Sequence, residues 1–312
     1  MSIAITCGDP FGIGPEILIK ASKEMGKDFP SSCIYGNEQL FEETCDLLGI
    51  KKFWSKNGPI HFKECFAYIE NQNCHIERAR AVLATLDAAI QDCINKERKN
   101  LVTCPIDKSI VRNLDTEFLG HTEYLAKKNH KDQTVMLLDN GDFRVALITG
   151  HIALCEVSSQ ITKDNIKKIL AIALPSLSTH FSIQKPRIAL LGVNPHAGEL
   201  QKRSEEETVI KPLIEELQQQ AVDIEGPFPA DSFFSHHKGQ FDLVLSPYHD
   251  QGLVAIKYPG LDKVVNTTLG LDFVRTSPGH GVAYDLYGQG KANPKSLIRA
   301  IQIAQHQSIT KN

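Results

Sequence analysis

Three histidines follow apolar, strand-like runs in the same kind of position. His151 follows RVALIT, His196 follows RIALLGV and His249 follows DLVLSP. In open α/β sheets, ligands bind beyond the carboxyl ends of the strands, where the connecting loops converge. Three neutral imidazoles at such an edge would suit a divalent metal ion that keeps positions open for a substrate. A single histidine after a strand is more often a turn or capping residue, so the metal hypothesis rests on the shared placement of all three.

Two carboxylates accompany these histidines. Asp250 directly follows His249, where it could orient the imidazole, and we expect Gly252 to let the chain turn away from the strand. Asp231 lies in the stretch GPFPADSFF, in an apolar setting. A helix N-cap and an acid/base role are equally good interpretations of Asp231.

A second set of polar residues could bind an anion. His121 and Thr122 directly precede a predicted helix, whose free N–H groups favour negative charge. Lys257, Asn266 and Arg275 follow the third histidine strand. Each of these would be an ordinary surface residue alone, but together they could bind a phosphate or a carboxylate.

Glycines cluster in GDPFGIGPEI, which contains Gly8, Gly12 and Gly14 and leads into a helix at Pro15. The spacing matches neither the GxGxxG dinucleotide fingerprint nor the GxxxxGK[ST] phosphate loop. The glycine-rich stretch LYGQGKANP near the C-terminus does not match them either. The first stretch therefore predicts only a strand, a turn and a helix with a close approach of the backbone.

Composition narrows the classes of function. The 312 residues carry a formal net charge of -3, so no overall positive field would attract nucleic acid or anionic lipid. No apolar run approaches the length of a membrane span, and MSIAITCGDP lacks the pattern of a signal peptide. We expect a cytoplasmic protein. The eight cysteines form no CxxC pair, which favours reduced core residues over a zinc knuckle or a disulfide framework.

The elements that must position these residues alternate along the chain. Strand-like runs are predicted at residues 2–7, 100–106, 134–139, 143–149, 187–194, 241–247 and 263–269. Helical periodicity is clear over 75–94, 163–177 and 205–220. Several strands are continuously apolar, which predicts a mainly parallel sheet covered on both faces by helices. Residues 51–75 show no clear period.

Seven stretches taken together resemble the 4-hydroxythreonine-4-phosphate dehydrogenase family of vitamin B6 synthesis. They are GDPFGIGPE, GHTEYLA, NPHAGE, GPFPADS, YHDQGL, VNTTLGLDFVRTS and HGVAYDL, in order from residue 8 to residue 286. The first stretch and HGVAYDLYGQGKANP also look like signatures of the isocitrate and isopropylmalate dehydrogenases. That superfamily binds NAD without a Rossmann fold, which accounts for the glycine spacing.

The resemblance implies a fold and an assembly. The expected architecture is the two-domain α/β/α sandwich of the isocitrate/isopropylmalate dehydrogenases, with a mainly parallel sheet and an active site in the interdomain cleft. Residues 1–115 with 270–312 would form the cofactor-side domain, and residues 116–269 the domain for metal binding and dimerisation. The expected state is a homodimer with a shared active site, without nucleic-acid or membrane partners.

The resemblance also implies roles for individual residues. The metal ligands would be His151, His196 and His249, with one supplied across the dimer interface. The substrate-binding residues would be His121, Thr122, Lys257, Asn266 and Arg275. The cofactor-binding residues would be Gly12, Gly14, His280 and Asn293, and the residues in catalysis Lys108, Asp231 and Asp250.

The implied reaction is the oxidation of 4-phosphooxy-L-threonine by NAD or NADP, followed by decarboxylation to 3-amino-2-oxopropyl phosphate. One divalent ion, Zn²⁺, Co²⁺, Mg²⁺ or Mn²⁺, would act as Lewis acid for the alcohol. Three alternatives remain open: a sister dehydrogenase of threonate or erythronate 4-phosphate, a phosphate acyltransferase on a related fold, and a non-catalytic binding protein.

Four features depart from the family pattern. Phe11 stands where a small residue is usual, Asp107 where His or Asn precedes Lys108, and Gly279 where Asp precedes HG. The loop at 200–207 lacks the usual glycines. These departures bear on the shape of the substrate and cofactor pockets more than on the histidines.

Overall fold

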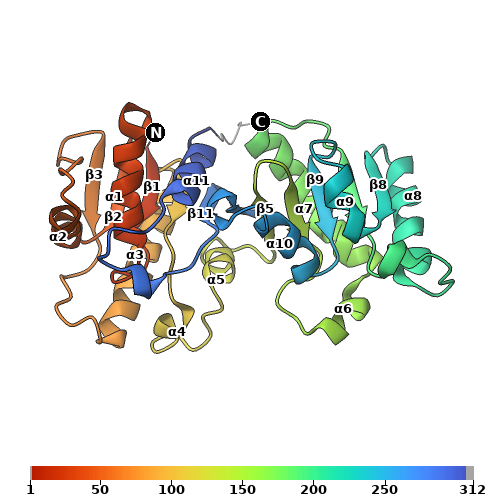
Figure 1. The fold of residues 1–312 in the computed structure, drawn as a ribbon, viewed down its shortest axis with the longest axis horizontal. Helices are drawn as coiled ribbons and strands as arrows, with labels where there is room; N and C mark the ends of the chain where they lie inside the picture. The colour runs from red at the N-terminus through yellow and green to blue at the C-terminus, as the bar shows by residue number, and fades with distance from the viewer. Residues whose placement is uncertain (1, 307–312) are drawn as a thin grey trace. The chain divides into compact units, whose positions relative to one another are not determined.

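The computed structural model describes residues 2–306, which divide into two compact units (Figure 1). The first unit contains residues 2–134 and 265–306, and the second contains residues 135–264. Residues 116–134 were expected in the second domain, but they lie in the first unit because Phe118 and Leu125 are buried in its core. Residues 265–269 also lie in the first unit, because they form a strand that pairs there. Residues 307–312 of the expected cofactor-side domain lie outside the described residues.

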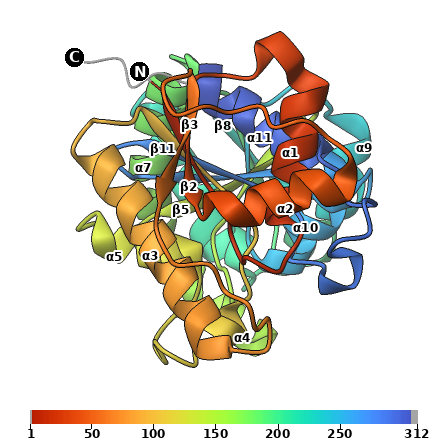
Figure 2. The same ribbon diagram turned by 90° about the vertical axis from the view of Figure 1, so that its left-hand side faces the viewer.

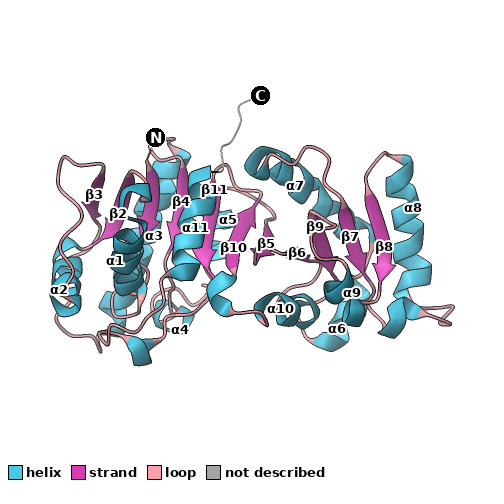
Figure 3. Ribbon diagram, turned by 45° about the horizontal axis from the view of Figure 1, so that its top comes forward, coloured by secondary structure: helices cyan, strands magenta, loops and turns pink. Residues whose placement is uncertain are grey.

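The first unit is built on a mainly parallel sheet. Its strands are β1 (Ile3–Thr6), β2 (Ser32–Gly36), β3 (Ile60–Glu64), β4 (Asn100–Thr103), β10 (Val265–Leu269) and β11 (Val274–Pro278). They lie in the order β3-β2-β1-β4-β11-β10 (Figure 3), and only the β10–β11 pair of this unit is antiparallel among the described strands. This arrangement confirms the α/β class expected from the apolar runs.

Helices cover both faces of the first unit's sheet. They are α1 (Gly14–Met25), α2 (Glu38–Leu48), α3 (His75–Ile94), α4 (Lys108–Val111), α5 (His121–Lys128) and α11 (Lys295–His306), with helical turns η1 (Gly26–Asp28) and η5 (Tyr284–Leu286). Ile3 and Ile5 of β1 pack on the side of α1, α2 and α11, whereas Ala4 packs on the side of α3 and α5 (Figure 2). Successive strand residues point to opposite faces, so a continuously apolar strand is needed to fill both layers.

The second unit repeats the same plan with a smaller sheet. Its strands are β5 (Val135–Asp139), β6 (Arg144–Leu147), β7 (Ile188–Leu191), β8 (Ile224–Phe228) and β9 (Leu243–Ser246), in the order β5-β6-β9-β7-β8. The helices are α6 (Leu154–Gln160), α7 (Lys163–Phe181), α8 (Lys211–Gln219), α9 (Ala230–His236) and α10 (His249–Lys257), with turns η2 (Pro195–Gly198), η3 (Glu206–Ile210) and η4 (Leu261–Lys263). Phe233 of α9 and Leu253 of α10 pack against Val145 and Val244 of the sheet. No helix among residues 2–306 is long and apolar enough to cross a membrane.

Candidate functional site

The three histidine-bearing strands are neighbours in the second unit's sheet. Strand β9 pairs in parallel with β6 on one side and with β7 on the other. Their carboxyl ends therefore open onto one edge, from which His151, His196 and His249 follow within a few residues. The shared placement predicted from the sequence is confirmed at the level of the strands.

His151 and His249 lie side by side. Their ring centroids are 5.5 Å apart, with a 44° angle between the ring planes. His249 Nδ1 donates a hydrogen bond of 2.7 Å to Asp250 Oδ1, which leaves Nε2 free as a ligand. Two imidazoles on one tetrahedral ion have centroids roughly 5 Å apart, because metal–nitrogen bonds are about 2.0–2.1 Å long. The pair thus fits a shared divalent cation.

His196 does not complete this pair within one chain. No group of three or more His, Cys, Asp or Glu side chains suited to a metal occurs among residues 2–306. His196 is exposed, in η2, and has φ 54°, followed by Ala197 at φ 52° and Gly198 at φ 73°. Left-handed backbone at non-glycine residues is costly and is retained where the surroundings hold it.

Glu206 holds the turn that carries His196. Its fully buried carboxylate accepts hydrogen bonds from the backbone N–H groups of Val193 (2.7 Å) and Asn194 (2.8 Å), and from the Asn194 side chain (2.9 Å). Burial alone would raise the pKa of Glu206, but these hydrogen bonds lower it below its usual value. The carboxylate is therefore ionised and fixes the route of the chain after β7.

Gly252 has a different role from the turn expected for it. It lies inside α10, and a Cβ there would come within 2.9 Å of both Ser246 Cβ and Val145 Cγ1. The glycine lets α10 pack closely on β6 and β9. Asp250 lies in the first turn of this helix, so it is the helix start that keeps the carboxylate beside His249.

The positions of Asp231 and Lys257 give less evidence about the roles of these residues. Asp231 is exposed in the first turn of α9, whose N-cap is Pro229, so the N-cap interpretation of Asp231 is wrong. Helix α9 lies against η2, which carries His196. Lys257 is the half-buried last residue of α10.

In the first unit, Arg275 is a buried cation. Its side chain is 1% exposed, its Nε and Nη2 donate to Thr103 Oγ1, and its Nη1 donates to Thr268 Oγ1. No carboxylate within residues 2–306 forms an ion pair with it. Burial lowers the pKa of the Arg275 guanidinium, yet a guanidinium stays protonated at neutral pH. A buried charge that is held only by hydroxyl groups favours binding of an anion.

His121 lies close to this cation and is neutral. Burial lowers its pKa well below the usual range, and the positive charges of Arg275 and Lys108 lower it further. His121 Nε2 and Asn266 Oδ1 are both buried without a hydrogen-bond partner in the described chain. Buried polar atoms normally have partners, so these two indicate a ligand site.

Thr122 and Lys108 flank the same cluster. Thr122 follows His121 in the first turn of α5, whereas both residues were expected just before the helix. A Cβ on Gly120 would lie 3.1 Å from Lys108 Nζ and 3.3 Å from Glu123 Oε2, so the ammonium group lies against the start of α5. His121, Lys108 and Arg275 are therefore brought together by the fold.

The proposed cofactor residues lie on two segments of the first unit that contact each other. Ile13 N donates to Val282 O, and a Cβ on Gly12 would lie 3.3 Å from the same oxygen. Gly14 is required by packing, since its Cβ would lie 2.0 Å from Cys7 O. His280 Nε2 is buried without a partner among the described residues, and Asn293 is exposed, with Oδ1 accepting from Lys295 N.

The comparisons with known proteins agree on one family. The family described as pyridoxal phosphate biosynthetic protein PdxA matches residues 28–304. A 4-hydroxythreonine-4-phosphate dehydrogenase from Sulfurihydrogenibium sp. is 37% identical over 314 residues, covering 97% of each chain. The chain belongs to this family. A relative of the same name from Burkholderia vietnamiensis is 36% identical, covering 97% of this chain and 95% of its own.

A solved structure supports the PdxA assignment. The 4-hydroxythreonine-4-phosphate dehydrogenase of Klebsiella pneumoniae superposes with a TM-score of 0.83 at 28% identity, covering 98% of each chain. Nearly the whole chain therefore follows the fold of that structure.

Two of this PdxA member's departures meet in one network. Arg78 Nη2 donates to both carboxylate oxygens of the buried Asp9 and lies over the rings of Phe11 and Tyr284. The Tyr284 hydroxyl lies 2.9 Å from Asp9 Oδ2 and 3.0 Å from Asp107 Oδ2. Phe11 and Asp107 thus stabilise the loop before α1 and the start of α4. Gly279 N donates to Ser296 Oγ.

Sequence reasoning missed Thr103, Thr268 and Glu206. Thr103 is the last residue of β4 and Thr268 is the fourth residue of β10, the two strands on either side of β11, and both read as ordinary strand residues. Glu206 is one of three successive glutamates. Only its burial distinguishes Glu206 from its neighbours.

Cys7 and Cys104 are buried, and burial raises the pKa of both thiols, so neither is an activated nucleophile.

Proposed function

We propose that this protein oxidises 4-phosphooxy-L-threonine with NAD or NADP to 2-amino-3-oxo-4-(phosphooxy)butanoate, which then loses CO₂ to give 3-amino-2-oxopropyl phosphate. The observation that supports this most directly is the His151–His249 pair with its orienting Asp250, in a chain of the PdxA family. The relatives named 4-hydroxythreonine-4-phosphate dehydrogenase align over nearly the full length of the chain.

The first unit would bind the anionic part of the substrate. Arg275 supplies a buried cation whose planar guanidinium can pair with two oxygens of a phosphate or carboxylate. His121 and Asn266 contribute the buried atoms that lack partners, and Lys108 adds a second positive charge near His121. Thr122 is a further proposed contact of this unit, and Lys257, a residue of the second unit, is another proposed substrate contact.

The second unit would hold the divalent ion through Nε2 of His249, an imidazole nitrogen of His151, and His196 of a second chain. When bound, the ion supplies a Lewis acid that lowers the pKa of a substrate hydroxyl. Asp250 positions His249 and selects its tautomer. Zn²⁺ and Co²⁺ suit imidazole, while Mg²⁺ and Mn²⁺ would need more oxygen ligands.

Proton transfer is assigned to Lys108, Asp231 and Asp250. Lys108 lies beside the start of α5, close to neutral His121. Asp231 is an exposed carboxylate, free to accept a proton from a substrate hydroxyl. Gly12, Gly14, His280 and Asn293 would contact the dinucleotide, and the buried Nε2 of His280 fits a hydrogen bond to it.

The assembly follows from the incomplete histidine set. Because His196 does not join the pair in one chain, we propose a homodimer in which each metal takes ligands from both chains. All eight cysteines are free thiols, which suits a reducing compartment such as the cytoplasm.

The test is an assay of NADH and NADPH formation with 4-phosphooxy-L-threonine, with threonate 4-phosphate and with erythronate 4-phosphate. We expect turnover of the first substrate, loss of turnover with a chelator and recovery with Zn²⁺, Co²⁺, Mg²⁺ or Mn²⁺. Turnover of only a sugar-acid phosphate would identify the sister dehydrogenase. Phosphate-dependent acyl transfer that survives chelation would identify the acyltransferase.

A further inference from the structure

Tyr284 contacts a residue of the first unit that lies far from it in the sequence. It belongs to η5, between β11 and α11, and its hydroxyl oxygen lies 3.0 Å from Asp107 Oδ2, 177 positions away. Asp107 stands where the family usually has His or Asn, and it directly precedes Lys108, which is assigned to proton transfer. A distant side chain therefore holds the residue next to Lys108.

Asp107 fixes the start of α4. Its Oδ1 accepts hydrogen bonds from Ser109 N at 2.8 Å and from Ser109 Oγ at 2.6 Å, so Asp107 is the N-cap of this helix. Lys108 is the first of only four residues in α4. A single helical turn has little stability of its own, because its few hydrogen bonds do not offset the cost of nucleation. The place of the Lys108 backbone therefore depends on the cap.

The Asp107 carboxylate depends in turn on its hydrogen-bond donors. Burial alone would raise the pKa of Asp107, but the hydrogen bonds that it accepts, from Ser109 and Tyr284 among others, lower it. The group is therefore an anion at neutral pH, and it forms no ion pair within residues 2–306. Hydrogen bonds to an ionised acceptor are roughly twice as strong as neutral ones, so the Tyr284 hydroxyl is a strong orienting contact.

This hydroxyl has one hydrogen and two carboxylates near it. Its oxygen also lies 2.9 Å from Asp9 Oδ2. Asp9 already accepts from Arg78 Nη2 at both oxygens, at 2.9 and 2.8 Å, and from Phe11 N at 3.0 Å. Arg78 neutralises the charge of Asp9, whereas Asp107 has no such cation in the described chain. A hydrogen bond from Tyr284 therefore stabilises Asp107 more than Asp9, and we assign the hydrogen to Asp107.

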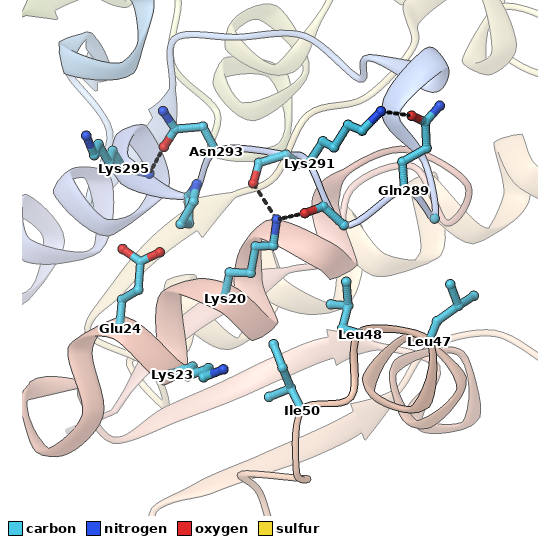
Figure 4. A pocket seen from close by; sticks show the side chains of 14 residues that line it. Lys20, Lys23, Glu24, Leu47, Leu48, Ile50, Gln289, Lys291, Asn293 and Lys295 are labelled. Atoms are coloured by element: carbon cyan, nitrogen blue, oxygen red, sulfur yellow. Dashed lines mark hydrogen bonds between the residues drawn. The ribbon is translucent and has the colours of Figure 1, made fainter.

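The surroundings hold Tyr284 in place. The Arg78 guanidinium lies over its ring, with Cζ 5.0 Å from the ring centroid. Further along the same segment, Lys20 Nζ donates to Gly290 O and to Ala292 O, each at 2.8 Å (Figure 4). Lys20 belongs to α1, so that helix fastens the segment that carries Tyr284. The hydroxyl is thus presented to Asp107 from a fixed position.

The Lys108 side chain needs this support. Lys108 is exposed, and its side chain forms no ion pair within residues 2–306. A Cβ on Gly120 would lie 3.0 Å from Lys108 Cε, so the ammonium group reaches the start of α5, where His121 lies. A flexible side chain without an anchor at its charged end is placed mainly by the backbone from which it starts.

We propose that Tyr284 is a positioning residue, which acts through Asp107 to hold Lys108 at the substrate. The proposal rests on the proposed function, which assigns proton transfer to Lys108. The phenol fixes the Asp107 carboxylate, the carboxylate fixes the single turn of α4, and that turn places Lys108 beside His121. A displacement of about 1 Å at a catalytic group can lower the rate about 100-fold, so the loss of one hydroxyl is sufficient for a large effect.

The kinetic test compares two backgrounds. Tyr284→Phe removes the hydroxyl and keeps the ring over Arg78. With 4-phosphooxy-L-threonine and saturating NAD or NADP, kcat should fall about tenfold or more, while KM changes by less than about threefold. In Lys108→Ala, the same substitution should change kcat by no more than about twofold, because no ammonium group is left to position. Equal losses in both backgrounds, or a rise in KM without a fall in kcat, would overturn the proposal.

Two further variants sharpen this comparison. Asp107→Asn keeps an oxygen for Ser109 and gains an N–H that can donate to the Tyr284 oxygen, so kcat should stay within about threefold. Asp107→Ala should lower kcat as much as Tyr284→Phe does, and unchanged kcat in Asp107→Ala would overturn the route through Asp107. Tyr68→Phe is the matched control: its hydroxyl donates to Glu43 Oε2 at 2.6 Å, outside the network, and its kcat and KM should not change.

A spectroscopic measurement needs no turnover. The lysines of the full-length protein are reductively methylated with ¹³C-formaldehyde, and the NMR signal of Lys108 is identified by its loss in Lys108→Arg. Tyr284→Phe should move this signal toward that of an exposed lysine such as Lys56, and Tyr68→Phe should leave it in place. An unmoved signal in Tyr284→Phe overturns the proposal. Failure of the unaltered protein to oxidise the substrate refutes the dehydrogenase, while the NMR result still decides whether Tyr284 positions Lys108.

Discussion

At the scale of single residues, this protein buries a positive charge that has no ion-pair partner in the described chain, although such burial does not favour folding. Arg275 is buried, and within residues 2–306 its donors meet only the hydroxyls of Thr103 and Thr268. His121 beside it is kept neutral, and one of its nitrogens has no partner in the described chain. Burying a charge without a counter-ion costs stability, so the arrangement makes sense as a site that a ligand completes.

Arg275→Met should separate function from stability. Because no carboxylate is left unpaired when the guanidinium is removed, the free energy of unfolding should change by no more than about 1 kcal/mol. The value of kcat/KM for the phosphorylated substrate should fall on the order of a hundredfold or more, since the anion loses its paired cation. Urea denaturation and steady-state kinetics measure the two effects. Arg275→Lys should recover part of the activity, and a loss of about 3 kcal/mol in Arg275→Met would instead assign a structural role.

Asp250→Asn should weaken metal binding without disturbing the fold. The carboxylate accepts from His249 Nδ1 and is itself 83% exposed, so its change should leave the unfolding free energy nearly constant. An amide does not impose the same tautomer, and the affinity for Zn²⁺ should fall about 10- to 100-fold. Competition with a chromogenic chelator measures the affinity. Asp164→Asn serves as an exposed control in the same unit, and equal metal affinity in Asp250→Asn and the unaltered protein would argue against an orienting role.

At the scale of elements, the sequence predicted the parts that follow from local pattern. The helix expected over 75–94 is α3 with the same bounds, and the one over 163–177 is α7, which continues to Phe181 with Pro175 inside it. Strands β2, β3, β8 and β11 were missed because SCIYG, IHFKE, IEGPF and VRTSP carry polar, charged or small residues or a proline among the apolar ones. The run over 205–220 divides into η3 and α8.

What the sequence could not predict depends on contacts between distant residues. The order β6-β9-β7 brings three histidine strands together, but the pairing of His151 with His249 depends on where each loop turns after its strand. The close packing at Gly252 and the hydroxyl shell of Arg275 also depend on which elements become neighbours. The sequence showed which residue types follow which strands, whereas it did not show which side chains lie against each other.

Helix α7 provides a prediction about pH. His180 is buried with Nδ1 lacking a partner among the described residues, and burial lowers its pKa from 6.5 to about 4. Below pH 6.5 His180 is protonated in the unfolded chain, whereas in the native chain it takes up a proton only near pH 4. The unfolded chain therefore binds more protons between these pH values, and the free energy of unfolding decreases as the pH falls. Going from pH 7 to pH 5, His180 should cost the protein about 2 kcal/mol.

The variant His180→Leu isolates this effect. Its loss of unfolding free energy between pH 7 and pH 5, measured by urea denaturation, should be about 2 kcal/mol smaller than that of the unaltered protein. His75→Ala, which removes an exposed histidine, should show the same pH dependence as the unaltered protein. If His180→Leu also retains the full acid sensitivity, His180 is not the group that titrates.

At the scale of the whole molecule, the histidines predict how subunits share a metal site. His151 and His249 meet within one chain, and no third side chain joins them among residues 2–306. If His196 comes from the partner in a two-fold symmetric dimer, each site contains the pair of one chain and the third ligand of the other. Variants of different histidines should then complement each other only in particular combinations.

Mixing His196→Ala with His249→Ala subunits should restore activity. In a mixed dimer the His196→Ala chain keeps an intact pair and takes His196 from its partner, so one of two sites is complete. Random exchange of equal amounts should give roughly a quarter of the activity of the unaltered protein. Mixing His151→Ala with His249→Ala should restore nothing, because each chain then carries a broken pair. Activity in this second mixture would show that His151 and His249 serve the same site from different chains, and activity in neither would place all three ligands in one chain.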